Sequence, residues 1–295
     1  MSDRGIVYVV TGEKFSRLAL QSLEYLRAVE PVVTVSVVIE SAQKELWDAH
    51  AETLDVEISE LKNPEYRAID KAKGLQQVNY ERFIYLDADT VPIRPFADDM
   101  FRALDFCEVL ALPGMALNYE WEKTDFSPAL SQYNGGVVGL AGRAAKNLPV
   151  QWEATYKEQD NPSYDQASLR ATILREGYRV GSLPPAFNFR GTGSVREPRV
   201  LHFTGQTRKQ DWYRSEKNRA KRIQYFATPG LSGRFAGFAK AYSIEDLDKK
   251  DGPGRYRWWL AGISRLVARR VQKTARSVLV TLRRLGQSRK KADRH

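Results

Sequence analysis

The sequence predicts an α/β protein with a mostly parallel, doubly wound sheet. Strand-like and helix-like segments alternate through the first ninety residues, and the strand-like segments are continuously apolar. Continuous apolar strands are typical of a sheet covered on both faces, whereas half-exposed strands alternate. The composition, 42% hydrophobic and 28% charged, is that of an ordinary globular protein with a sizeable core. We therefore expect helices on both faces of one sheet.

The first half of the chain supplies most of these segments. Residues 6–10 (IVYVV) are largely β-branched and end at Thr11-Gly12, while the leucines between Lys14 and Val29 recur at helical spacings. The predicted strands here are Ile6–Val10, Val32–Ile39, Val56–Leu61 and Arg82–Leu86, and the predicted helices are Lys14–Val29, Gln43–Glu52 and Tyr66–Val78.

The regular alternation stops after Pro92. Beyond it, we expect strands at Glu108–Leu112, Gly136–Leu140 and Val200–Phe203, helices at Ala145–Gln159 and Tyr164–Glu176, a polar loop at Asn118–Gln132 and an extended segment at Leu183–Arg190. The last strand is expected to belong to the core.

The charge divides the chain into two predicted parts, residues 1–248 and a tail of residues 249–295. The tail holds 15 Lys/Arg and 2 Asp/Glu, a net charge of +13, so the total of +10 leaves −3 for the body. Apolar residues from Trp259 to Leu285 recur every three or four positions, which predicts an amphipathic helix with a basic face. Such a helix suits an anionic membrane surface. Nucleic acid is the alternative partner, less favoured because tryptophans begin the apolar stripe.

The cysteine content, the first residues and the length of the apolar runs bear on where the protein acts. Cys107 is the single cysteine, so no disulfide forms within the chain, which favours a reducing compartment. The first ten residues enter a strand without a basic leader, and no apolar run approaches the length of a membrane span. We expect a cytoplasmic protein, peripheral on the inner face of the membrane.

Asp87 and Asp89 are the strongest chemical signal. They directly follow an apolar strand, at the carboxyl end where open α/β sheets bind ligands. Positions i and i+2 of an extended chain point the same way, so both carboxylates can reach one divalent cation. The alternative is a pair of solvated acids at a strand end.

The segment YLDADT resembles the D-x-D motif of nucleotide-diphospho-sugar transferases of the GT-A fold. Further matches follow in the order typical of family 8 glycosyltransferases, the glycogenin and bacterial lipooligosaccharide galactosyltransferase type. The matching features are Lys71 ahead of the motif, Tyr133-Asn134-Gly135-Gly136-Val137-Val138, Asp165-Gln166 with Leu169, Leu183 to Phe189, and Leu201-His202-Phe203-Thr204-Gly205. The resemblance covers roughly residues 5–212.

The resemblance implies a site. Asp87, Asp89 and His202 would hold the metal, with Mn²⁺ favoured over Mg²⁺ because one ligand is an imidazole. Asp165 and Gln166 would act on the donor sugar, unless Asp165 merely caps a helix. The nucleotide-sugar contacts would come from Thr11, Gly12, Lys71, Asn134, Gly135, Arg208 and Lys209, with Asn188 as a weaker candidate. The segment HFTGQTRKQDW departs from the family's H-x-x-G-x-x-K-P-W, so the basic residue that touches phosphate stays open.

The expected function is therefore transfer of a sugar from a nucleotide-diphosphate sugar, with UDP-sugar as the expected donor, to a glycan, glycolipid or lipid-linked acceptor with retention of configuration. Two alternatives stay open. A nucleotidyltransferase of sugar phosphates also places paired acids on an α/β sheet, although the chain shows no Gly-rich loop to cradle a triphosphate. A non-catalytic binding protein would keep the fold and use its basic tail for a partner.

Overall fold

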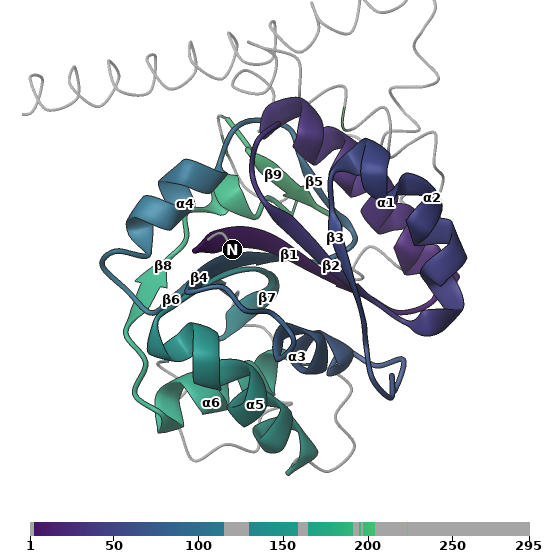
Figure 1. Ribbon diagram of the computed structural model, residues 1–295. Helices are drawn as coiled ribbons and strands as arrows, with labels where there is room; N and C mark the ends of the chain where they lie inside the picture. The colour runs from purple at the N-terminus through teal and green to yellow at the C-terminus, as the bar shows by residue number, and fades with distance from the viewer. Residues whose placement is uncertain are drawn as a thin grey trace, which may run out of the picture. The chain divides into compact units, whose positions relative to one another are not determined.

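Figure 1 shows a computed structural model of the chain, which describes residues 3–114, 130–158, 165–190, 195, 197–203 and 223. The predicted boundary near residue 248, the amphipathic tail, Arg208 and Lys209 lie outside the described residues. Most of the predicted loop at 118–132 lies outside them as well.

The centre of the described part is a seven-stranded sheet with the order β3-β2-β1-β4-β7-β6-β8 (Figure 1). Its strands are β1 (Arg4–Val10), β2 (Val35–Ile39), β3 (Glu57–Glu60), β4 (Arg82–Leu86), β6 (Val109–Pro113), β7 (Tyr133–Ala141) and β8 (Val180–Ser182). β1 pairs in parallel with β2 and β4, β2 with β3, and β6 with β8, while β7 runs antiparallel to β4 and β6. The predicted mostly parallel sheet is confirmed.

Helices cover both faces of this sheet, as Figure 1 shows. The helices are α1 (Glu13–Val29), α2 (Lys44–Leu54), α3 (Asp70–Leu75), α4 (Ala97–Ala103), α5 (Arg143–Lys157) and α6 (Gln166–Arg175). Alternate residues of β1 pack into different cores: Tyr8 joins the cluster under α1, α2 and α4, and Val9 joins the cluster under α3, α5 and α6. The doubly wound arrangement follows because every buried strand has an apolar partner on each face.

Several elements differ from the sequence-based expectation. The second strand begins at Val35 because Val32, 92% exposed, lies in a turn before the sheet. The predicted helix from Tyr66 is only α3, since Tyr66 has a left-handed backbone with φ of 55° that a right-handed helix excludes. The expected extended run after Leu183 contains a 3₁₀ turn, Pro185–Phe187, which proline at its first position favours.

The expected last core strand belongs to a separate two-stranded sheet. β9 (Val200–His202) pairs antiparallel with β5 (Thr90–Pro92), which directly follows the D-x-D segment. Neither β5, α4 nor β8 was expected from the sequence. Within the described ranges, no helix is long and apolar enough to cross a membrane.

Candidate metal and donor site

The site lies at the carboxyl edge of the parallel strands. β4 ends at Leu86, so Asp87 emerges at this edge. β7 runs the other way, which places its first residues at the same edge, and the Asp87 amide donates to the Gly136 carbonyl at 2.8 Å. The D-x-D segment and the Asn134-Gly135-Gly136 segment are therefore neighbours, although about fifty residues separate them.

The β5–β9 sheet brings His202 to the two acids. Thr90 is paired with His202 across this sheet, and the Phe203 amide donates to the Asp89 carbonyl at 3.0 Å. His202 Nε2 lies 3.3 Å from Asp89 Oδ1 and 3.7 Å from Asp87 Oδ2. One ligand atom from each of the three side chains lies within 4.8 Å of the others.

This donor set fits one divalent cation. Ligands about 2.1 Å from an octahedral ion are about 3 Å from each other, which the observed separations approach. Two carboxylate oxygens and one imidazole nitrogen suit manganese better than magnesium, which prefers oxygen alone. The expected metal residues are thus brought together, and which ion they select stays a prediction.

A chain of buried amides sets the tautomer of His202. The Gly136 amide donates to Asn134 Oδ1 at 3.0 Å, so that atom is an acceptor, and Asn188 Nδ2 donates to the same oxygen at 2.8 Å. Asn188 Oδ1 therefore faces His202 Nδ1, at 2.8 Å, and must accept a hydrogen bond from the Nδ1–H group. In the neutral imidazole this hydrogen bond leaves the lone pair on Nε2, which is directed towards the carboxylates as a metal ligand requires.

The chain comes close behind the imidazole at Gly136. A Cβ at this position would lie 2.0 Å from Cε1 of His202, a separation no real side chain tolerates. Glycine is therefore needed here for close approach and not for a turn. The ring of His202, which is 6% exposed, is held between β7 and Asn188.

Lys71 forms ion pairs with Asp87, one of the metal residues, and with Asp165, the residue expected to contact the donor sugar. Its Nζ lies 3.0 Å from Asp87 Oδ1 and 2.7 Å from Asp165 Oδ2. Burial disfavours the charged ammonium, but attraction from Asp165 and then Asp87 outweighs it and raises the pKa of Lys71 well above its usual value. A permanent positive charge thus lies between the two carboxylates.

Asp165 precedes α6 without capping it. Its side chain makes no hydrogen bond to the helix amides and pairs with Lys71 instead, so a simple capping role does not account for it. Its carbonyl accepts from Trp152 Nε1 at 3.1 Å and Ser168 Oγ at 2.8 Å, which fixes the backbone. Gln166, the first residue of α6, is partly exposed beside it.

The other residues expected to contact the nucleotide sugar differ in their burial and in their distance from the Lys71–Asp165 pair. Gly135 lies against the same cluster, since its carbonyl accepts from Lys71 Nζ at 3.4 Å and a Cβ there would be 3.0 Å from Asp165 Oδ2. Asn134 is 1% exposed, and its oxygen is already occupied by the amide chain. Thr11 and Gly12 directly follow β1, at the same edge of the sheet.

Sequence reasoning missed two residues of this site. Tyr85 Oη donates to Asp87 Oδ1 at 2.5 Å, and burial followed by the Asp87 charge raises the pKa of Tyr85 well above its usual value, so the phenol stays a donor. Arg190 is a partly buried cation whose pKa burial lowers, with attraction to Asp89 acting against this. Alternation in an extended chain offered a signal for both, since Tyr85 is two residues from Asp87 and Arg190 two from Asn188.

Comparison with known proteins identifies the fold. No protein-family model matches the chain, and no curated protein sequence matches it either. Among solved structures, the galactosyltransferase LgtC in complex with donor and acceptor sugar analogues matches with a TM-score of 0.55 and 13% identity, over 76% of this chain and 95% of LgtC. The chain has the GT-A fold.

A second match is the apo form of the glycosyltransferase GlyE from Streptococcus pneumoniae TIGR4, with a TM-score of 0.53 and 14% identity. It covers 70% of this chain but only 55% of GlyE, so the chain spans about half the length of that protein. At 13–14% identity the similarity shows a shared fold, whereas the chemistry of this chain depends on the residues of its own site.

Proposed function

We propose that the chain is a metal-dependent glycosyltransferase that takes its sugar from a nucleotide-diphosphate sugar, with UDP-sugar as the expected donor. The observation that carries this proposal is the convergence of Asp87, Asp89 and His202 at the carboxyl edge of a GT-A sheet. The Lys71–Asp165 pair beside that cluster supplies both a cation and a carboxylate for the donor.

The residues divide into two groups by the part of the donor they would contact. A divalent cation held by Asp87, Asp89 and His202 would stabilise the negative charge that develops on the leaving diphosphate. Lys71 would neutralise charge beside it, and the glycine at position 135 keeps the chain clear of Asp165, since a Cβ there would lie 3.0 Å from Asp165 Oδ2. Asp165 would accept hydrogen bonds from sugar hydroxyls, with Gln166 next to the anomeric carbon. We infer that transfer retains the anomeric configuration.

Titration calorimetry with UDP-, GDP- and CDP-sugars, with and without Mn²⁺, tests this function. We expect one class of sugar nucleotide to bind only when Mn²⁺ is present, and to release its nucleoside diphosphate when an acceptor is added. NMR of the first-formed product should show the donor's configuration. Release of pyrophosphate from a nucleoside triphosphate and a sugar phosphate would instead identify a nucleotidyltransferase, and no metal-dependent binding at all would leave a non-catalytic protein.

We further propose that the acceptor is a glycan, glycolipid or lipid-linked sugar, and that residues 249–295 hold the protein on an anionic membrane, placing it on the cytoplasmic face. The net charge of +13 supports this, since the body carries −3. Each basic residue near an anionic bilayer contributes about 1 kcal/mol, so five of the 15 give roughly 5 kcal/mol.

Truncation after Gly254 tests the tail. We expect the full chain to sediment with anionic liposomes, less so at high salt because screening shortens electrostatic attraction. The shortened protein should stay in the supernatant and still bind its donor. Sedimentation of the shortened protein, or preference of the full chain for RNA at the same salt, would contradict the membrane proposal.

A further inference from the structure

The two carboxylate oxygens of Asp87 lie in different surroundings. Oδ1 accepts from the Tyr85 hydroxyl at 2.5 Å and pairs with Lys71 Nζ at 3.0 Å. Oδ2 faces His202 Nε2 at 3.7 Å, and the same nitrogen lies 3.3 Å from Asp89 Oδ1. Two protein donors therefore hold Oδ1, while Oδ2 is the oxygen directed towards the other metal residues.

Tyr85 reaches this carboxylate because of its place in β4. Residues 85 and 87 are two apart at the end of an extended strand, so their side chains leave the chain on the same side. The ring of Tyr85, which is 2% exposed, packs in the core under α3, α5 and α6. Lys71, on α3, lies over this ring with its Nζ 5.5 Å from the ring centre, a cation–π arrangement. Packing thus holds the phenol with its hydroxyl at Oδ1.

The backbone of Asp87 is held as well. Its amide donates to the Gly136 carbonyl at 2.8 Å, and its carbonyl accepts from the Thr90 amide at 3.0 Å and from Thr90 Oγ1 at 2.7 Å. Because both backbone groups are bonded, the side-chain torsions are the main remaining freedom of this residue. The hydrogen bond from Tyr85 restricts that freedom, so it decides which oxygen faces His202.

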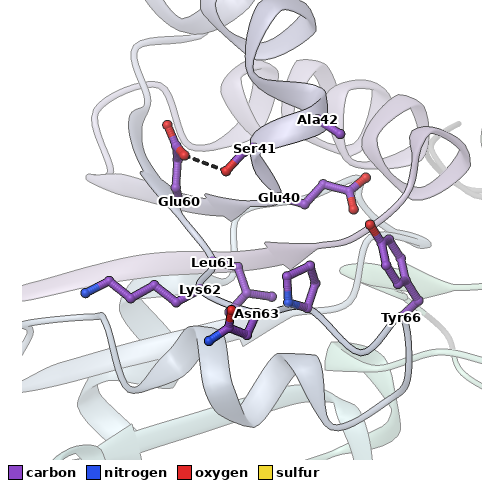
Figure 2. Close-up of a pocket in the computed structure, with 9 residues that line it drawn as sticks. Glu40, Ser41, Ala42, Glu60, Leu61, Lys62, Asn63 and Tyr66 are labelled. Carbon is purple, nitrogen blue, oxygen red and sulfur yellow. Dashed lines mark hydrogen bonds between the residues drawn. The ribbon is translucent and has the colours of Figure 1, made fainter.

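A second bond between a hydroxyl and a carboxylate, at the same edge of the sheet, shows the difference that burial makes. In Figure 2, Ser41 Oγ donates to Glu60 Oε2 at 2.6 Å on the wall of a cavity of about 530 Å³. Both of these side chains are exposed, so water can replace the hydroxyl and the carboxylate can turn. The side chain of Asp87 is 24% exposed, but its donor Tyr85 is buried, so Asp87 keeps one orientation.

We propose that Tyr85 sets both the way Asp87 binds the cation and the ion that the site prefers. With Oδ1 held by Tyr85 and Lys71, Asp87 binds the cation through Oδ2 alone. Ca²⁺ has about six to eight oxygen ligands and commonly takes both oxygens of one carboxylate, whereas an octahedral ion such as Mn²⁺ can use a single oxygen. Tyr85 therefore favours the smaller ion, and it acts through Asp87 as a positioning residue. This inference rests on the proposed function.

The substitution Tyr85→Phe removes the hydroxyl and keeps the ring. We expect the affinity for Mn²⁺ to fall about 10- to 100-fold, the usual cost of losing an outer-shell partner of a metal ligand. The affinity for Ca²⁺ should fall less or rise, because Oδ1 becomes able to turn to the ion. Titration with Mn²⁺, followed by the EPR signal of the free ion, and with Ca²⁺, followed by calorimetry, measures both affinities. A purely structural role of Tyr85 would lower the two by the same factor.

Tyr80→Phe is the matched control. It removes a tyrosine hydroxyl that shares a hydrogen bond of 2.7 Å with Ser36 Oγ, and residue 80 precedes β4, at the opposite edge of the sheet. This variant should bind both ions as the wild type does. Equal losses for Mn²⁺ and Ca²⁺ in Tyr85→Phe, or an unchanged affinity for Mn²⁺, overturn the inference while the metal site stands.

A crystal structure of the wild type with Mn²⁺ does not depend on how the variant folds. It should show Asp87 bound to the ion through Oδ2, with the Tyr85 hydroxyl still on Oδ1. Both oxygens of Asp87 on the ion would overturn the inference alone. Failure of the wild type to bind Mn²⁺ at all would overturn the metal site, and the proposed function with it.

Discussion

Asp89→Ala is expected to abolish metal-dependent donor binding while the protein stays folded. The substitution removes the carboxylate whose Oδ1 lies 3.3 Å from His202 Nε2, leaving two protein ligands. The loss should exceed the roughly 10- to 100-fold that removal of an outer-shell partner costs a metal site. The fold should survive, because Asp89 is only partly buried and alanine retains the carbonyl that accepts from the Phe203 amide.

Calorimetry with UDP and Mn²⁺, beside a thermal unfolding curve, measures both effects of Asp89→Ala. Asp98→Ala is the matched control, since Asp98 is an exposed acid in the first turn of α4 whose side chain pairs with Arg4. The metal assignment is wrong if Asp89→Ala binds the nucleotide with Mn²⁺ as tightly as Asp98→Ala does.

Lys71→Met is expected to destabilise the metal-free protein by about 3–5 kcal/mol, the usual cost of removing one partner from a buried ion pair. Asp165, whose side chain is 9% exposed, would lose the cation 2.7 Å away, and Asp87 would lose the one at 3.0 Å. Mn²⁺ should restore part of the loss, because the ion would neutralise Asp87. Urea unfolding with and without Mn²⁺ measures the free energy of unfolding.

The double variant Lys71→Met/Asp165→Asn separates charge from packing. It removes the carboxylate left without its cation, so most of the lost stability should return, and the coupling follows from the double-mutant cycle. The raised pKa of Lys71 sets the pH dependence. Its contribution is complete below the unfolded lysine pKa of about 10.4 and lost only as pH rises through the folded value. The difference between wild type and Lys71→Met should therefore stay level from pH 6 to 9, and a fully stable Lys71→Met would contradict the electrostatic role.

Much of the sheet was predictable because its strands are buried on both faces. Residues 6–10 (IVYVV) and 83–86 (FIYL) are continuously apolar, which is the pattern expected of a strand buried on both faces. The bounds of the predicted strand Arg82–Leu86 agree with those of β4. The direction of β7 was not predictable, since a strand buried on both faces has the same composition whether it runs parallel or antiparallel. α4 was missed because it is only seven residues long, too short for a helical period to show.

The candidate site was predictable where short-range geometry decides it. Asp87 and Asp89 lie on one side because they are two residues apart after a strand. His202 came only from the resemblance, since no spacing in the sequence connects residue 202 to residue 89. The amide chain through Asn134 and Asn188 depends on tertiary packing. Pattern alone cannot supply contacts of that kind.

The reversed direction of β7 also bears on how such a protein can diversify. β6 ends and β7 begins at the site edge, where Pro113 is paired with Tyr133 and the Gly114 amide donates to the Gln132 carbonyl at 2.6 Å. Gly114 and Gln132 are thus held next to each other at this edge of the sheet. Residues added between two such neighbouring points cost little to close into a loop and leave the β6–β7 pairing unchanged. The sheet can therefore keep its register while the sequence between these two residues varies.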